Sequence, residues 1–217
     1  KEVGSTAVVI DETLSVMRLR PGLYAETMQR MRRGRKVQIL GVAEADGVRY
    51  FKVAAPPVGF GWVQADAVFG KFRPDDEARL ANLVQASSGF DRIELAASFL
   101  ELYPASRLRP PILLLFGDLV EEMAAKLSRD ASNRLKRAEM AATAAPVHSY
   151  YLNFVSLDRY RKLGIRFLFN SSYRTFHYDG ETWKELVEKF STAAETAEAK
   201  KRLDTLRSKL ERRRASN

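Results

Sequence analysis

The chain contains no cysteine, and this absence excludes several kinds of chemistry. Without thiols there is no disulfide, no thiolate nucleophile and no cysteine-based metal site. Histidine is almost as scarce, because only His148 and His177 occur and their spacing matches no zinc-binding pair. The longest apolar run, residues 112–116, is far shorter than the roughly 18 residues that a membrane-spanning helix needs. We therefore expect no metal, no cofactor and no transmembrane segment.

The sequence motifs of the common enzyme classes are also missing. There is no Gly-x-Ser-x-Gly nucleophile elbow, no phosphate-binding Gly-x-x-x-x-Gly-Lys loop and no Gly-x-Gly-x-x-Gly dinucleotide fingerprint. The acidic pairs Asp75/Asp76 and Glu121/Glu122 are sequence neighbours, and adjacent positions on a helix point in different directions. They therefore cannot act as a general acid and base on one substrate. We predict a protein that is not an enzyme.

The charge is strongly positive and unevenly distributed. The 36 Lys and Arg residues exceed the 27 Asp and Glu residues and give a formal net charge of +9. Residues 71–150 are balanced, with 11 basic and 11 acidic side chains, whereas residues 151–217 carry 15 basic and 9 acidic ones. An excess of this kind favours anionic partners such as nucleic acid, lipid headgroups or cell-wall polymers, but it selects none of them.

Residues 14–69 have the pattern of a small antiparallel β-structure. Short apolar runs alternate with turn residues, and Val37 and Ile39 fall on one face of the strand that contains them. Asp46-Gly47 is a strong signal for a tight hairpin turn between two such runs. Gly61 lets the backbone bend beside Trp62, whose position within a strand predicts a core residue. The pattern predicts a strongly bent barrel.

Four sequence pieces in this stretch carry a family resemblance. They are Met17-Arg18 ahead of Pro21, Gly34 to Leu40, Tyr50-Phe51-Lys52-Val53, and Gly59-Phe60-Gly61-Trp62-Val63. In this order they resemble a bacterial Src-homology-3-like (SH3-like, or SH3b) domain, which is a binding and targeting module. Ser15-Val16 and Pro56-Pro57 depart from that family's pattern.

The resemblance implies that peptidoglycan or a peptide is the ligand. The expected ligand contacts are the residues that fall in turn regions, namely Arg18, Arg20, Tyr24 and Phe60.

The composition changes after residues 72–76, where glycine becomes sparse and helix-forming residues dominate. Pro74 and the acidic residues that follow it suit the start of a helix. We expect helices at residues 75–87, 90–103, 109–141, 147–177, 180–191 and 194–213, with a break in the third near Ser128 or Ser132. The predicted domains are an SH3-like barrel at 5–71 and an α-helical domain at 75–214.

Two helical stretches resemble each other at an offset of 87 residues. They are 95–117 and 183–203, and each has a helix that ends in an aromatic residue, then a polar turn and a second helix. Tyr103-Pro104-Ala105-Ser106 resembles the turn of a tetratricopeptide repeat. This resemblance implies stacked helical hairpins that share a core and dock a protein partner.

The aromatic-rich segment 150–178 is expected to be the central buried helix of that domain. The alternative is an aromatic-lined groove that grips a peptide or a glycan.

The predicted fold is multi-domain, all-β followed by all-α: a small SH3-like barrel and a tetratricopeptide-like domain of helical hairpins. The predicted function is a non-catalytic binding or scaffold protein of the bacterial cell envelope. The alternative is a basic protein that binds nucleic acid or another anionic polymer, through the basic C-terminal third and Arg30, Arg32, Arg33, Arg35 and Lys36. The absence of an initial Met fits a mature form that has lost its targeting segment, so the expected compartment is periplasmic or envelope-associated, and otherwise cytoplasmic.

Overall fold

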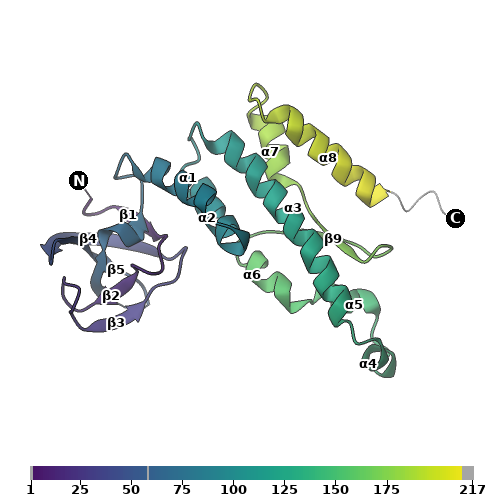
Figure 1. Cartoon of the computed structure of the whole chain (residues 1–217), viewed down its shortest axis with the longest axis horizontal. Coiled ribbons are helices and arrows are strands. Elements are labelled where there is room, and N and C mark those ends of the chain that lie inside the picture. Colours follow the sequence, from purple (N-terminus) through teal and green to yellow (C-terminus); the bar gives the residue numbers. More distant parts are fainter. Residues whose placement is uncertain (1, 58, 212–217) are drawn as a thin grey trace. The chain divides into compact units, whose positions relative to one another are not determined.

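The computed structural model describes residues 2–57 and 59–211. The chain divides into two compact units, Lys1–Ser106 (unit 1) and Arg107–Asn217 (unit 2), which we describe separately. Antiparallel strands occupy the N-terminal part and helices dominate the rest, as the sequence predicts (Figure 1).

Unit 1 is built on a seven-stranded sheet with the strand order β3-β2-β6-β5-β4-β1-β7. Every paired strand is antiparallel to its neighbour. The strands, purple to blue in Figure 1, are β1 (Thr6–Val9), β2 (Val16–Arg18), β3 (Thr27–Arg30), β4 (Lys36–Ala45), β5 (Val48–Ala54), β6 (Phe60–Gln64) and β7 (Val68–Phe69). A single 3-10 turn, η1 (Ala65–Ala67), precedes β7.

The core of unit 1 lies on one face of this sheet, and strand alternation selects its residues. Val37 and Ile39 of β4 are buried together as predicted, while Gln38 between them is exposed. Phe51 and Val53 of β5 and Val63 of β6 face the same core.

The hairpin between β4 and β5 turns at Asp46-Gly47, which confirms the prediction for this dipeptide. Both residues have positive φ angles, 52° and 71°, as a two-residue hairpin turn of type I′ requires.

Gly61 is required for close packing rather than for its backbone angles: an added Cβ would meet the Met17 side chain and lie 3.1 Å from the Arg18 carbonyl oxygen.

Two helices, α1 (Asp76–Ala86) and α2 (Gly89–Leu102), pack on each other and belong to unit 1. Asp76 is fully buried, and its carboxylate accepts hydrogen bonds from the Gly70 amide and from Arg73 Nε, both at 3.0 Å. The Tyr103 hydroxyl donates to the Gly70 carbonyl oxygen at 3.1 Å. Because the chain beyond β7 is bound in this way, the compact unit extends to residue 106, and the boundary expected at 71–75 lies inside it.

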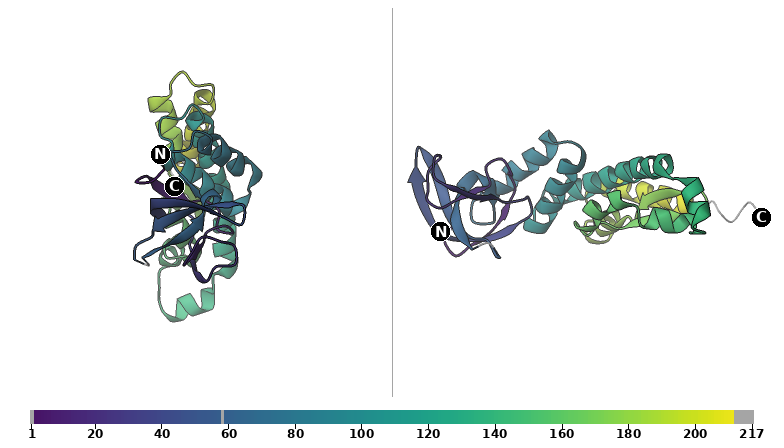
Figure 2. Two further views of the ribbon diagram at one scale, coloured as in Figure 1. Left: turned by 90° about the vertical axis from the view of Figure 1, so that its left-hand side faces the viewer. Right: turned by 90° about the horizontal axis from the view of Figure 1, so that it is seen from below.

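Unit 2 contains helices and one β-hairpin. Its helices are α3 (Arg109–Arg134), α4 (Arg137–Ala142), α5 (Val147–Leu152), α6 (Asp158–Arg161), α7 (Glu181–Lys189) and α8 (Thr196–Glu211), with a 3-10 turn η2 (Val155–Leu157). Two prolines occupy the first turn of α3, where their missing N–H groups cost nothing. The α3 helix packs against α7, and α7 forms a hairpin with α8 (Figures 1 and 2).

Glycine allows the closest contact between α3 and α7. Gly117 of α3 is buried against the indole of Trp183, which is 1% exposed. The space where a Cβ would stand is filled by the Trp183 ring.

The helix predicted at 147–177 is wrong, and with it the prediction that everything after residue 75 is α-helical. The segment forms α5, η2, α6 and then a hairpin of β8 (Phe167–Asn170) and β9 (Thr175–Tyr178). Gly164 and Arg174 have positive φ angles of 77° and 56°, which a continuous helix cannot contain. The aromatic residues of β8 and β9 alternate with period two, and this pattern belongs to strands.

One other predicted helix boundary changes. The helix expected at 109–141 runs unbroken through Ser128 and Ser132, where a break was predicted, and stops at Arg134 before α4 begins. Residues 212–213 of the helix expected at 194–213 lie outside the described residues, as does the end of the domain expected at 75–214. Within the part of the chain that the structure describes, no helix combines the length and the apolar character needed to cross a membrane.

Candidate binding surfaces

The face of the unit 1 sheet opposite the core carries a row of cationic and aromatic side chains. Arg18 pairs with Trp62, and Trp62 pairs with Lys52, across β2, β6 and β5. Residues directly opposite each other in antiparallel strands project from the same face, so Trp62 lies between the strand positions of two cationic residues. We call Arg18, Lys52, Phe60 and Trp62 the outer-face row.

Exposure within the outer-face row is typical of a surface available to a ligand. Phe60 is two residues from Trp62 on the same face of β6, and it is 64% exposed. Trp62 itself is half-buried, which corrects the prediction that it belongs to the core: its neighbours Gly61 and Val63 face the core instead. An exposed phenyl ring and a half-buried indole therefore share one face of the sheet with two cationic residues.

Arg18 has a structural role as well as a place in this row. Its Nη1 donates to the Ala25 carbonyl oxygen at 2.7 Å and to Thr27 Oγ1 at 3.4 Å, so it holds the loop between β2 and β3. The same loop is attached at a second point, where the Leu23 amide donates to Asp46 Oδ2 at 2.8 Å.

The four residues predicted as ligand contacts are partly brought together. Arg18 and Phe60 belong to neighbouring strands of one face, while Arg20 and Tyr24 lie in the β2–β3 loop, where Tyr24 is 94% exposed. Sequence reasoning missed Lys52 as a contact. The signal was present, because Lys52 sits between the buried Phe51 and Val53 and must therefore face outward.

The basic cluster that motivated the nucleic-acid alternative is largely engaged within unit 1. Arg33 lies 3.2 Å from Glu94 and 3.4 Å from Asp91, and Lys36 lies 2.6 Å from Glu101. Arg30 and Arg35 donate to main-chain carbonyl oxygens. Burial raises the pKa of Glu94, and the neighbouring Arg33 guanidinium partly opposes this rise.

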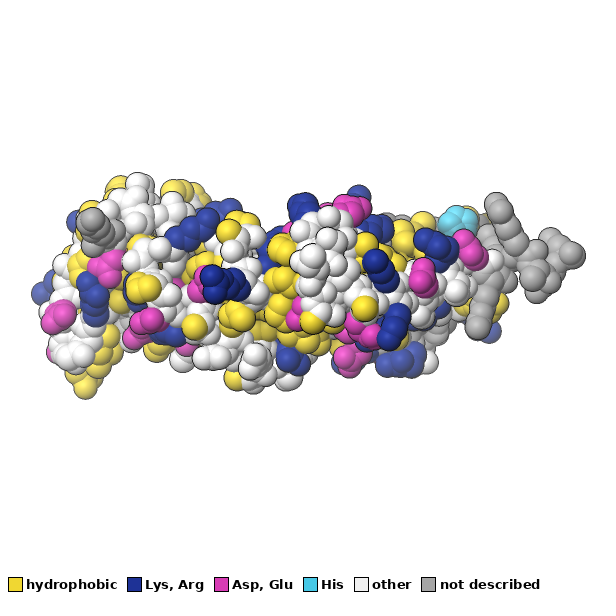
Figure 3. Space-filling model, turned by 90° about the horizontal axis from the view of Figure 1, so that it is seen from above, with side chains coloured by type: hydrophobic (Ala, Val, Ile, Leu, Met, Phe, Trp, Pro, Cys, Tyr) yellow, Lys and Arg dark blue, Asp and Glu magenta, His cyan; other side chains and the backbone are white. Residues whose placement is uncertain are grey.

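On the face drawn in Figure 3, basic and acidic side chains are interspersed and do not form one positive patch.

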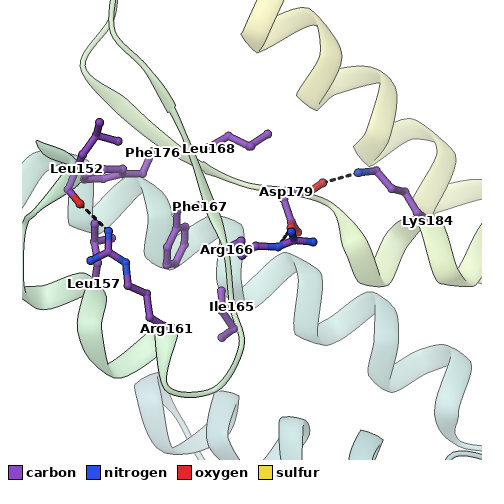
Figure 4. A pocket seen from close by; sticks show the side chains of 10 residues that line it. All are labelled: Leu152, Leu157, Arg161, Ile165, Arg166, Phe167, Leu168, Phe176, Asp179 and Lys184. Carbon is purple, nitrogen blue, oxygen red and sulfur yellow. Dashed lines mark hydrogen bonds and ion pairs between the residues drawn. The ribbon is translucent and has the colours of Figure 1, made fainter. Parts of the chain in front are cut away.

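A second candidate site is a hollow of about 470 Å³ in unit 2 (Figure 4). Apolar side chains from α5, η2 and the β8–β9 hairpin form much of its lining, with charged groups beside them (Figure 4). The apolar residues are Leu152, Leu157, Ile165, Phe167, Leu168 and Phe176, and the charged ones are Arg161, Arg166, Asp179 and Lys184. The hollow lies within the segment for which the sequence left open an aromatic-lined groove.

The charged residues of the hollow differ in how fully they are engaged. Arg161 donates to the Leu152 carbonyl oxygen at 2.6 Å and pairs with Asp158 at 3.2 Å. Arg166 is 75% exposed and pairs with Asp179 at 3.3 Å. Lys184 Nζ makes one hydrogen bond, to the Asp179 carbonyl oxygen at 2.9 Å, and an ammonium group has three N–H donors (Figure 4).

The β9 strand is fixed to the long helix α3 by a half-buried carboxylate. Glu121 Oε2 accepts from the Tyr178 amide at 2.8 Å, and its Oε1 lies 3.0 Å from His177 Nδ1 and 2.8 Å from Lys209 Nζ. Burial alone would raise the pKa of Glu121, but the hydrogen bonds from His177, Lys209 and the Tyr178 amide together lower it.

One further contact extends this network. Thr175 Oγ1 lies 3.0 Å from His177 Nε2, so hydroxyl, imidazole and carboxylate follow one another. Because Lys209 and a main-chain amide also bind the carboxylate, the whole group connects β9 to α3 and α8.

No group of three or more metal-ligating side chains occurs in the described portion of the chain. Comparisons of the chain with family models, with curated proteins and with solved structures found no match in any of the three.

Proposed function

We propose that the chain is a non-catalytic binding protein whose unit 1 is an SH3-like module. The observation that carries this proposal is the outer-face row, in which a half-buried indole and an exposed phenyl ring share one sheet face with two cationic residues. A ligand that combines a carboxylate with an apolar side chain would satisfy both parts, because the cations bind the anion and the rings cover the apolar group.

The ligand class proposed for this surface is a carboxylate-bearing peptide, and the peptide stems of peptidoglycan belong to that class. Phe60 and Trp62 supply contact area at low entropy cost, since aromatic side chains have few rotatable bonds. Lys52 faces outward with no described partner for its ammonium group. A place in the bacterial envelope follows from this choice of ligand and is part of the proposal, as is the docking of a protein partner on unit 2.

A binding experiment with matched charge variants tests the proposal. The full chain and its Lys52→Glu and Phe60→Ala variants are incubated with purified cell-wall sacculi, and the bound fraction is measured at several salt concentrations. Arg32→Glu is the control, since Arg32 is exposed and lies outside the outer-face row. We expect both test variants to lose most of their retention while the control keeps it.

Two results would contradict the proposal. An equal loss of retention in Lys52→Glu and Arg32→Glu would mean that positive charge at any surface position supports binding to the sacculi, so the binding would be non-specific. No retention of the unmodified chain above a basic reference protein would remove the wall peptide as ligand.

The nucleic-acid alternative makes a different prediction in the same design. The affinity of the chain for nucleic acid would fall steeply with salt and would depend on Arg32 rather than on Phe60. The engagement of Arg33 and Lys36 by unit 1 carboxylates argues against it.

A further inference from the structure

The two edges of the β8–β9 hairpin are in different states. The β9 edge is covered, because the Phe176 amide donates to Ser128 Oγ at 2.8 Å and the Tyr178 amide donates to Glu121 at 2.8 Å. Both acceptors belong to α3. Among the described residues this sheet consists of β8 and β9, so its remaining edge belongs to β8.

The register identifies which main-chain groups of β8 face its free edge. Phe167 is opposite Tyr178 and Phe169 is opposite Phe176. Because the amides of Phe176 and Tyr178 point toward α3, these are the non-hydrogen-bonded pairs of the ladder. The N–H and C=O groups of Phe167 and Phe169 therefore point away from β9, and they have no hydrogen-bond partner among the described residues.

The hollow of Figure 4 lies along this same strand. Its lining includes the consecutive residues Phe167 and Leu168, whose side chains project from opposite faces of β8. The hollow therefore lies beside the β8 strand, and it also reaches Phe176 of β9. An extended chain placed along β8 would therefore form main-chain hydrogen bonds and also insert an apolar side chain into the hollow.

We infer that β8 accepts an extended acidic peptide from a partner protein as a third strand of this sheet. Strand addition explains the free main-chain groups, since such a peptide hydrogen-bonds to an exposed sheet edge. Charge complementarity identifies the peptide as acidic. The lining carries three cations and one carboxylate. Arg161 pairs with Asp158, and Arg166 pairs with Asp179 and lies 3.9 Å from Glu181, whereas the ammonium group of Lys184 binds a carbonyl oxygen and has no carboxylate partner among the described residues. Arg166 and Lys184 retain donors for a carboxylate of the peptide.

The experiment uses the full chain labelled with nitrogen-15, and it measures amide hydrogen exchange residue by residue. The probe is the capped pentapeptide acetyl-Asp-Val-Leu-Val-Glu-amide. Two control peptides accompany it: one carries Lys in place of both acidic residues, and the other is N-methylated at both Val residues and so cannot pair with a strand edge. In the free protein, the amides of Phe167 and Phe169 should exchange much faster than those of Leu168 and Asn170.

On adding the acidic peptide we expect the exchange of Phe167 and Phe169 to slow at least tenfold. The N-methylated peptide should give no such protection, and the Lys peptide should bind at least tenfold more weakly. The double variant Arg166→Glu with Lys184→Glu should reverse the preference between the acidic and Lys peptides. The matched control is Lys126→Glu with Arg129→Glu, two exposed positions on α3, and it should keep the original preference.

Three results would overturn the inference. Slow exchange of Phe167 and Phe169 in the free protein at all concentrations would mean that the edge is already covered. Protection that grows with protein concentration in the absence of peptide would assign the edge to a second copy of this chain. Equal binding of the acidic and Lys peptides, or no protection by the acidic peptide, would remove the proposed ligand.

Discussion

Gly117→Ala should destabilise unit 2, although the same change in an exposed helix would stabilise it. Alanine is favoured over glycine by about 1 kcal/mol within a helix. Here the new Cβ would collide with Trp183 Nε1 and would lie 2.7 Å from Cε2 and 2.8 Å from Cδ1 of that ring. Ordinary contacts to a Cβ are 3.4–4 Å, so the indole must move.

The surroundings of Trp183 leave that ring little room to move. Its ring makes an edge contact with Tyr178 at 5.4 Å between centroids, and Gly180 is close enough that a Cβ added there would lie 3.4 Å from Trp183 Cε3. Overpacking of this kind costs about 1–3 kcal/mol or more. The clash therefore exceeds the gain in helix propensity, and we expect a net loss of about 2 kcal/mol.

Urea unfolding measured by circular dichroism and by tryptophan fluorescence tests this prediction. A Trp62→Phe background leaves Trp183 as the sole reporter, because the chain contains two tryptophans. Ala125→Gly, at an exposed position of α3, is the control and should lose about 1 kcal/mol from propensity alone. Combining Gly117→Ala with Trp183→Phe, followed by circular dichroism alone because this variant lacks tryptophan, should cost less than the sum of the two single changes, since the smaller ring leaves space. A higher unfolding midpoint for Gly117→Ala would refute the reasoning.

Two further changes test the other packed regions. Glu121→Gln should cost unit 2 about 1–3 kcal/mol, because three donors lose a half-buried carboxylate, whereas Glu122→Gln, which is exposed, should stay within about 0.5 kcal/mol. Since the pKa of Glu121 is lowered in the folded state, its contribution is present above the ordinary value near 4.5 and is lost as the pH falls below it. The acid side of the stability profile should therefore flatten in Glu121→Gln, and an unchanged profile would contradict the assignment. Gly61→Ala should cost unit 1 about 1–3 kcal/mol through overpacking against Met17, and thermal unfolding with no loss would contradict it.

The β-structure at the start of the chain could be predicted because its signals are local. The Asp46-Gly47 turn and the alternation of Val37 and Ile39 depend on residues close together in sequence. The same alternation places Lys52 outward. Local patterns could not predict that β2 pairs with β6, because the pairing of Arg18 with Trp62 joins residues far apart in the chain.

The error at residues 147–177 has a physical cause. Aromatic residues at spacings such as 150/154 fit the face of a helix, and the spacings 167/169 and 176/178 fit a strand equally well. Long-range contacts stabilise the strand over the helix, because Glu121 and Ser128 of α3 accept hydrogen bonds from the β9 amides. A single sequence does not reveal which distant acceptors will be present, so the hollow beside β8 could not be predicted either.

The buried carboxylate of Asp76 limits how unit 1 can be cut or transplanted. A fragment that ends after β7 would leave the Gly70 amide without its acceptor and Arg73 absent from its position over the rings of Phe69 and Phe51. A fragment for expression or fusion should therefore contain all of unit 1, Lys1–Ser106, with both helices retained. We therefore expect the strands and the helical pair that follows them to unfold together, as one cooperative unit.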